Sequence, residues 1–299
     1  MEDFIEACKI GDVGVGVVDR LLQDSRVDPS DRDNYVIRWV SKNGHLEVVD
    51  RLLQDPRVDP SADDNYAIRL ASLRGHLEVV DRLLEDPRVD PSDDDNYAIR
   101  WASVNKHVKV VNRLLQDSRV DPSDRDNYAI QWASENGHLE IVNRLLQDPR
   151  VDPSDRDNYA IVWASEDGHL EVVDRLLQDS RVDPSDGGNY AIQWASKNGQ
   201  LEVVDRLLQD PRVDPSDNNN YAIRLASENG HLEVVDRLVE YFRKKQQQML
   251  VDIGIGLKGM NIPVLVQLEI YKKLENNIPE EAKLRPATEW NVLKAIHLV

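Results

Sequence analysis

The apolar residues of this chain recur with one period over most of its length. Tyrosines stand at positions 35, 66, 97, 128, 159, 190 and 221, always 31 residues apart, and each opens nearly the same stretch, NYAIRWASENGHLEVVDRLLQDPRVDPSD. A fixed period of this length indicates an internal structural repeat. The sequence therefore predicts an array of equivalent repeats.

Within one repeat, the pattern of apolar and polar positions predicts two helices joined by a turn. In the first full repeat we expect a helix over about residues 35–43, with Asp33 or Asn34 as its N-cap and a glycine after its last turn. A second helix follows from about residue 45. The segment DPRVDPSD contains two prolines and few side-chain donors, so it predicts an extended loop. The second helix carries one apolar stripe at helical spacing: Leu46, Val49, Leu52 and Leu53.

A single repeat is too small to be stable by itself. About five buried side chains at about 2 kcal/mol each do not balance an ordering cost of about 1 kcal/mol or more for every residue. Neighbouring repeats must bury each other's apolar stripes, which predicts an all-α solenoid of stacked helix-turn-helix repeats. We expect a degenerate capping repeat in residues 1–31, seven full repeats in residues 32–248 and a small helical tail in residues 249–299.

The repeated stretch resembles a known family. YAIRWAS followed by GHLEVVDRLL is similar to the ankyrin signature TPLHxAA followed by GHxxVVxxLL, and the resemblance covers about residues 4–242. Each repeat is shorter than the usual ankyrin length of about 33 residues, and the deficit lies in the loop, which puts the β-hairpin finger of ordinary ankyrins in question. The resemblance implies a scaffold for protein–protein interaction without enzymatic activity. Short Pro- and Asp-rich repeats of this kind also resemble those in proteins of large DNA viruses and protists.

The resemblance implies where a partner binds. In ankyrins the end of the first helix and the loop tips face ligands, and the repeats of this chain differ most at the end of that helix. Four residues after each tyrosine stands a tryptophan or a leucine, which is either a binding hot spot or plain packing between adjacent helices. Our hypothesis is a concave groove with a tryptophan stripe and Arg or Gln beside it. The candidate partner-binding residues are Arg38, Trp39, Lys42, Arg69, Leu73, Arg74, Arg100, Trp101, Val104, Gln131, Trp132, Glu135, Trp163, Glu166, Gln193, Trp194, Lys197, Arg224 and Glu228.

Composition narrows the class of partner. The chain has 37 Lys and Arg against 55 Asp and Glu, and a net charge of −18 disfavours nucleic acids and anionic membranes. The opening MEDFIEACKI lacks the basic and apolar regions of a secretion signal, and no window has the length of a membrane span. The single cysteine, Cys8, suits a reducing compartment and is expected to be a small buried hydrophobe. We expect a cytoplasmic or nuclear protein whose partners are proteins, with no nucleic acid, membrane or small-molecule substrate.

No pattern in the chain predicts a catalytic, metal or cofactor site. The repeated histidines lie on helices that pack about 8 to 10 Å apart, too far to share one zinc ion, and are expected to organise the turn between the helices. Acidic loops such as residues 93–96 lack the glycine and glutamate of an EF-hand. GIGLKG at residues 254–259 matches G-x-G-x-x-G, but Pro263 follows almost at once and no βαβ unit surrounds it. We therefore expect no enzymatic activity, no metal and no cofactor.

The tail after residue 248 differs from the repeats. IPVLVQLEIYKKL at residues 262–274 predicts a helix that is apolar on several sides, and TEWNVLKAIHLV from Thr288 predicts a second, amphipathic helix. The tail resembles the F-box pattern L-P-x-x-L-x-L-E-I-x-x-x-L with a later tryptophan, which implies docking on the adaptor of a cullin-type ubiquitin ligase. A structural cap on the last repeat is the favoured alternative. The residues that match the F-box pattern are Ile262, Pro263, Val266, Leu268, Glu269, Ile270, Leu274 and Trp290.

Overall fold

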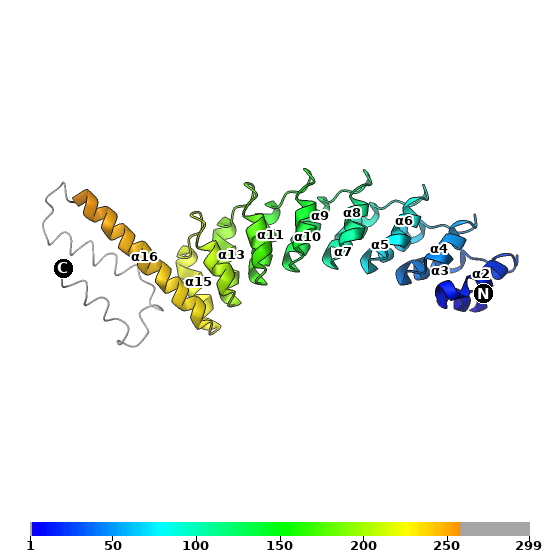
Figure 1. Cartoon of the computed structure of the whole chain (residues 1–299), viewed down its shortest axis with the longest axis horizontal. Coiled ribbons are helices and arrows are strands. Elements are labelled where there is room, and N and C mark those ends of the chain that lie inside the picture. The colour runs from blue at the N-terminus through cyan, green and yellow to red at the C-terminus, as the bar shows by residue number, and fades with distance from the viewer. Residues whose placement is uncertain (1, 258–299) are drawn as a thin grey trace. The chain divides into compact units, whose positions relative to one another are not determined.

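The structure, a computed structural model, describes residues 2–257, and the regular elements of this part of the chain are helices (Figure 1). Packing divides the chain into two units. The N-terminal unit contains the residues up to Ile161 together with Gln178–Val182, and the C-terminal unit contains Val162–Leu177 together with the residues from Asp183 onward.

Each full repeat contributes two helices. The N-terminal unit contains α1 (Glu2–Lys9), the 3-10 turn η1 (Gly11–Gly14), α2 (Val15–Leu22), α3 (Asp31–Asn43), α4 (Leu46–Leu53), α5 (Ala62–Arg74), α6 (Leu77–Leu84), α7 (Asp93–Val104), α8 (Val108–Leu114), α9 (Asp124–Glu135) and α10 (Leu139–Leu145). Helix α11 (Asp155–Glu166) crosses the boundary between the units. The C-terminal unit contains α12 (Leu170–Leu176), α13 (Asp186–Lys197), α14 (Leu201–Leu207), α15 (Asp217–Glu228) and α16 (Leu232–Leu257).

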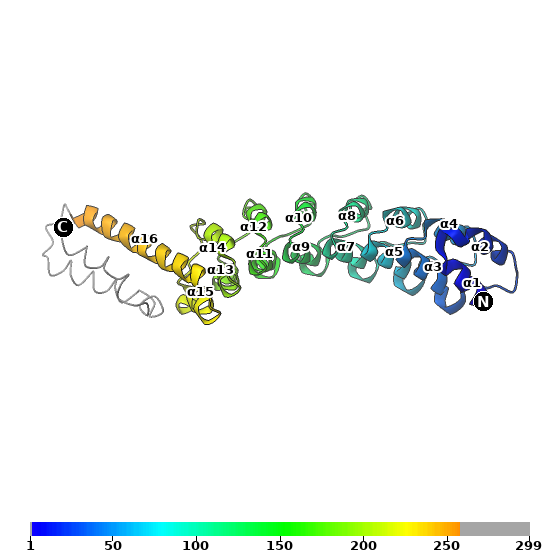
Figure 2. The same cartoon turned by 60° about the horizontal axis from the view of Figure 1, so that its bottom comes forward.

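The helices stack in two layers within each unit. In the N-terminal unit the first helices α3, α5, α7 and α9 pack on one another in sequence, and the second helices α4, α6, α8 and α10 form the neighbouring layer (Figure 2). In the C-terminal unit α13 packs on α15, while α12, α14 and α16 pack in order. This stacking confirms the predicted all-α solenoid of helix-turn-helix repeats.

Small and branched apolar residues fill the core between the layers. In α5 and α6, Ala67, Ile68, Val80 and Leu83 are fully buried. Alanine on the first helix lets adjacent helices approach closely, and the second helix supplies the larger side chains. The stripe on the second helix differs slightly from the prediction. Val48, Val49 and Leu52 are buried, whereas Leu46 and Leu53 are only half-buried.

Each first helix is preceded by a left-handed turn that the sequence analysis did not predict. Helix α3 spans Asp31–Asn43, but Arg32, Asp33 and Asn34 within these bounds have φ of 53°, 55° and 58°, so its uninterrupted right-handed part runs from Tyr35, as predicted. Asparagine and aspartate adopt this conformation more readily than most other residues. The expected N-cap role of Asn34 is not observed, because its side chain instead bonds to the loop of the next repeat.

A left-handed residue also ends each first helix. Gly44 has φ of 76°, and a Cβ at this position would lie 2.6 Å from Nδ1 of His76 in the next repeat, so glycine fits both the backbone and the neighbour. In the repeat of α7 and α8 this position is Lys106, which has φ of 62°.

We therefore expect Lys106→Gly to raise the free energy of unfolding by about 1 kcal/mol, because glycine avoids the cost of a left-handed residue with a side chain. Urea denaturation followed by circular dichroism measures this change. Lys109→Gly, within helix α8, is the control and is expected to lower stability. A lower stability for Lys106→Gly would contradict the argument.

The loops between repeats contain no strand within residues 2–257. The β-hairpin finger that the short repeat length put in question is accordingly absent from this part of the chain. In the segment DPRVDPS the loop is instead held by serine, whose N–H and hydroxyl both donate to the preceding aspartate, as Ser123 does to Asp121 at 3.0 and 2.7 Å.

The two ends of the array are described in part. Phe4 and Val18 are fully buried in the predicted capping repeat, while Ile10 and Val17 are exposed. At the other end α16 continues to Leu257, past the predicted end of the last repeat. No helix in residues 2–257 has both the length and the apolar character that crossing a membrane requires.

Candidate partner-binding surface

A buried asparagine connects neighbouring repeats. The Oδ1 of Asn96 accepts the N–H of Asp121 at 2.7 Å, and its Nδ2 donates to Oδ2 of Asp124 at 2.8 Å. Because this side chain is 5% exposed, its amide is committed to holding the next loop. Sequence reasoning missed this role, although an asparagine directly before every repeated tyrosine was the available signal. The same pair of bonds is made by Asn65, Asn127 and Asn189.

An arginine in each loop makes a second connection. The guanidinium of Arg150 binds both carboxylate oxygens of Asp148, at 3.0 and 2.7 Å, and donates to the carbonyl of Val120 in the preceding repeat at 2.8 Å. The hydrogen bond from Arg150 holds the pKa of Asp148 below its usual value. The same bond to the preceding repeat is made by Arg57, Arg88, Arg119 and Arg181.

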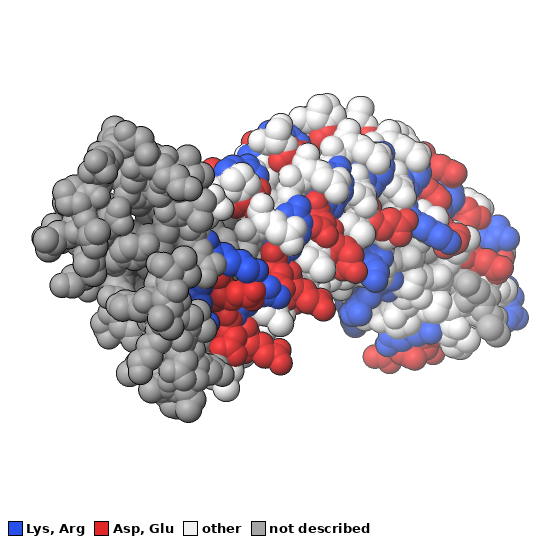
Figure 3. All heavy atoms as spheres, turned by 60° about the vertical axis from the view of Figure 1, so that its left-hand side comes forward, with Lys and Arg blue, Asp and Glu red and all other residues white. Residues whose placement is uncertain are grey.

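Ion pairs link the second helices. Arg82 Nε lies 2.7 Å from Oδ1 of Asp50, and Arg113 Nε lies 2.6 Å from Oδ1 of Asp81. Figure 3 shows basic and acidic side chains next to one another over the described part of the face in view. The excess of carboxylates is thus partly neutralised by arginines of adjacent repeats.

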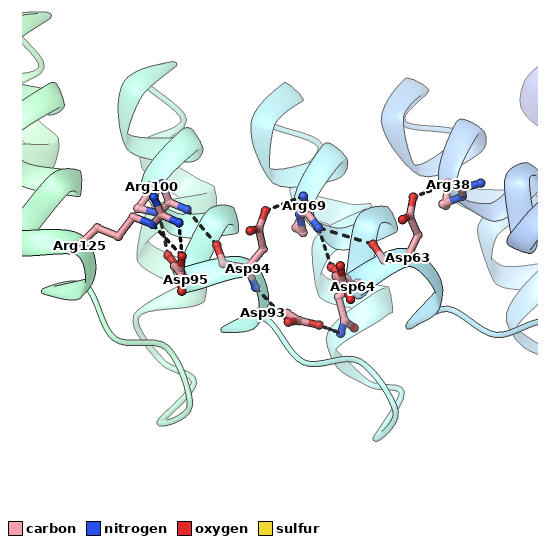
Figure 4. A network of polar contacts seen from close by, with 10 residues as sticks. Arg38, Asp63, Asp64, Arg69, Asp93, Asp94, Asp95, Arg100 and Arg125 are labelled. Atoms are coloured by element: carbon pink, nitrogen blue, oxygen red, sulfur yellow. Dashed lines mark hydrogen bonds and ion pairs between the residues drawn. The ribbon is translucent and has the colours of Figure 1, made fainter.

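Three of the predicted partner-binding residues are buried in these connections. Arg100 donates to the carbonyls of Asp95 and Asp94 at 2.7 and 2.9 Å, and these two carbonyls belong to the left-handed turn (Figure 4). Gln131 and Gln193 donate in the same way to the carbonyls of Asp126 and Gly188. The exposed fractions are 7% for Arg100, 2% for Gln131 and 3% for Gln193, so a partner does not reach these side chains. Their assignment to the partner-binding surface is therefore corrected to a role in holding the turn.

Three other arginines of the predicted partner-binding set, Arg38, Arg69 and Arg224, stack on tyrosines. The guanidinium of Arg69 lies 5.2 Å from the ring centroid of Tyr66 and 4.7 Å from that of Tyr97, and its Nη2 lies 2.6 Å from Oδ2 of Asp94. Arg38 and Arg224 are also half-buried and lie over Tyr66 and Tyr221. In the N-terminal unit, the contacts of Arg38 and Arg69 form a cation–π column beside the left-handed turns.

The tryptophans are half-buried and pack with one face on their own repeat. The ring centroid of Trp101 lies 5.5 Å from that of Tyr97, and Trp132 lies 5.2 Å from Tyr128. Each of these side chains keeps part of its surface accessible, so packing and partner contact are compatible. The other half-buried tryptophans are Trp39, Trp163 and Trp194. The leucines at the equivalent position of two repeats, Leu70 and Leu225, are buried.

The variable residues lie at the turn between the two helices of each repeat. Here a histidine bridges to the preceding repeat: Nε2 of His107 donates to the carbonyl of Leu73 at 3.0 Å, and Gln200 makes the equivalent bond with its amide. Burial lowers the pKa of His76, which makes the same contact to the Lys42 carbonyl. Half-buried at this turn are Lys42, Leu73, Val104, Glu135, Glu166 and Lys197, and exposed are Arg74 and Glu228.

Residues 2–257 contain no cluster of three or more His, Cys, Asp or Glu side chains with the geometry to hold a metal ion. Cys8 is 1% exposed, and burial raises the pKa of its thiol to about 12, so it stays protonated near neutral pH.

The stacked helix pairs, with connections repeated at each junction, define an α-helical repeat protein in which each repeat contacts its neighbours. A family model described as ankyrin repeats (3 copies) matches residues 37–127, 68–157, 97–186, 130–219 and 161–249, together well over half of the chain. The chain belongs to the ankyrin-repeat family, whose members are protein–protein interaction domains, typically without enzymatic activity. No individual curated protein matches it. The matched windows end before the F-box-like residues 262–290, which lie outside the described residues.

Proposed function

We propose that the chain is a non-enzymatic scaffold that binds a partner protein through the turn edge of its repeats. The observation that carries this proposal is the separation of two kinds of position. Ala71 and Ser72, whose residue types recur in almost every repeat, are fully buried. The following residues, Leu73 and Arg74, change from repeat to repeat and lie at the accessible turn. Variation at accessible positions on a constant frame is suited to recognition.

The recognition edge combines apolar and charged side chains. Half-buried tryptophans supply rigid apolar area, and the turn residues supply charge, which is the usual composition of a protein-binding surface. In the N-terminal unit this edge is Trp39, Lys42, Leu73, Arg74, Trp101, Val104, Trp132 and Glu135. In the C-terminal unit it is Trp163, Glu166, Trp194, Lys197 and Glu228. The proposal places this scaffold in the cytoplasm or nucleus and requires no cofactor, metal, nucleic acid or membrane.

The test uses a substitution that the chain itself contains. Leu70 stands at the tryptophan position of α5, so Trp101→Leu combined with Trp132→Leu is compatible with the repeat. A partner is first captured from the native cell with the full chain, and its dissociation constant is then measured by calorimetry. We expect the double variant to bind at least about tenfold more weakly, because aromatic hot spots contribute about 2 kcal/mol or more.

The control for that measurement is Val17→Ala, an exposed apolar residue of α2 that belongs to no part of the proposed recognition edge. It is expected to bind within about twofold of the unchanged chain. Circular dichroism verifies that each variant is folded. Equal affinity of the folded double variant and the unchanged chain would remove the tryptophans from the recognition edge.

The second candidate is a substrate receptor of a cullin-type ubiquitin ligase, in which the repeats bind the target and the tail binds the ligase adaptor. It is favoured by the F-box-like stretch IPVLVQLEIYKKL at residues 262–274. The full chain and a variant with Val266→Glu and Leu268→Glu are compared as baits. Recovery of cullin components with the unchanged chain alone would support this function, and their absence from both captures would leave the scaffold.

A further inference from the structure

The cationic side chains of the described residues are almost all engaged within the fold. Arginines of the loops and second helices pair with aspartates, and Lys197 lies 4.0 Å from the ring centroid of Trp194. Within residues 2–257, four cationic side chains have no such ion pair, hydrogen bond or aromatic contact: Lys42, Arg74, Lys106 and Lys109. Lys42 is half-buried and the other three are exposed.

These four side chains belong to three successive repeats of the N-terminal unit. They stand at the end of α3, the end of α5, and the turn into and start of α8. The turns are in direct contact, because His76 donates to the Lys42 carbonyl and His107, next to Lys106, bonds to the carbonyl of Leu73. We call Lys42, Arg74, Lys106 and Lys109 the basic turn strip.

The basic turn strip is positively charged, whereas the chain as a whole is negatively charged. At the start of the second helix the first two full repeats carry Glu47 and Glu78, whereas the third carries Lys109. The strip therefore places four cations beside two carboxylates. The same edge in the next repeat along the chain carries Glu135 and Glu140, without a cation. In a chain of net charge −18, this local excess of unpaired cations within residues 2–257 attracts a negatively charged partner.

We propose that the basic turn strip binds an acidic segment of a partner protein. This inference deepens the proposed function and rests on it. Adjacent repeats lie about 10 Å apart, and an extended peptide advances about 3.3 Å per residue. Carboxylates at every third residue of such a segment match the spacing of the repeats, while the half-buried Leu73 and Val104 contact its apolar side chains. A nucleic acid is disfavoured because its continuous phosphate charge meets the acidic surface on both sides of the strip.

The test measures binding of a defined probe to the full chain. The probe is a fluorescein-labelled peptide of about twelve residues with glutamate at every third position and leucine and glycine between. Fluorescence anisotropy gives its dissociation constant in low salt. We expect the variant with Lys42→Gln, Arg74→Gln, Lys106→Gln and Lys109→Gln to bind about tenfold more weakly or worse. Added salt is expected to weaken binding of the unchanged chain.

The control variant has the same change in net charge at other exposed positions: Lys9→Gln, Arg20→Gln, Lys244→Gln and Lys245→Gln. It is expected to bind the peptide within about twofold of the unchanged chain. Glu78→Gln removes an exposed carboxylate beside the strip and is expected to strengthen binding severalfold. This gain does not depend on the stability of the quadruple variant.

Three results of the peptide measurements would overturn the inference. These are equal losses in the strip variant and its control, no binding of the peptide by the unchanged chain in low salt, and tighter binding of a single-stranded oligonucleotide than of the peptide. Failure of the proposed function is seen separately, in the partner captured from the native cell. A partner that binds the unchanged chain and the strip variant equally well would overturn the basic turn strip but leave the scaffold. Capture of no partner at all would overturn both.

Discussion

Asn127→Ala is expected to lower the free energy of unfolding by about 3 kcal/mol, the largest effect of any single polar substitution discussed here. The side chain is 4% exposed, accepts the N–H of Asp152 at 2.8 Å and donates to Asp155 at 2.9 Å. Its removal leaves a buried N–H without a partner, and alanine is also less tolerant of the left-handed φ of 60°. Guanidinium denaturation measures the loss.

Asn136→Ala in the same repeat is the matched control. Its amide makes a single bond, to the carbonyl of Trp132 at 2.8 Å, and the side chain is exposed to water. We expect a change of about 0.5 kcal/mol or less. Similar losses for the two variants would show that the buried asparagine does not hold the repeats together.

Acidification is expected to produce the second large effect, a fall in the midpoint of thermal unfolding by about 10 °C or more between pH 7 and pH 3. The hydrogen bond from the loop arginine holds the pKa of the loop aspartate below its usual value in repeat after repeat. The unfolded chain therefore binds protons first as the pH falls below about 4. The stability that these bonds contribute is fully present above that pH and is lost as the pH falls through the lower pKa of the folded chain. The aspartates concerned are Asp55, Asp86, Asp117, Asp148 and Asp210.

Asp148→Asn separates this cause from the general change of charge. The amide keeps the shape of the side chain but does not titrate, so the variant is less stable than the unchanged chain at pH 7 by about 1 kcal/mol. At pH 3 the difference is expected to narrow, because Asp148 of the unfolded chain then binds a proton and the ion pair of the folded chain contributes less net stability. A difference that stays constant with pH would contradict the role assigned to the Arg150–Asp148 pair.

The repeat architecture could be predicted from the sequence because buried positions are marked by the regular spacing of apolar residues. Apolar residues such as Ile68 and Leu83 recur at helical spacing in every repeat, and the glycine after the first helix marks its end. The prediction of stacked helix pairs was confirmed for this reason. The left-handed turn was missed because its signal lies in backbone dihedral angles. Arg32 and Asp33 are residues that a capped helix also contains, so side-chain type did not distinguish the two structures.

The surface was harder to predict than the core. Gln131 and Arg74 are both long polar side chains on a first helix, yet one is buried against a carbonyl and the other is exposed. The difference arises from the direction of the turn carbonyls, which no periodicity encodes. The predicted contributions of the tryptophans and turn residues to partner binding stay predictions, and the F-box-like tail lies outside the described residues.

The asparagine, histidine and loop-arginine contacts are nearly the same at each junction that they connect. Any two internal repeats are therefore compatible neighbours, since the donors of one meet the acceptors of the next whatever their order. Unequal recombination can therefore add or remove a block of thirty-one residues, and the repeats on either side of the change still make the same contacts. Selection can then act directly on the number of repeats, which lengthens or shortens the array while the contacts between neighbouring repeats stay the same.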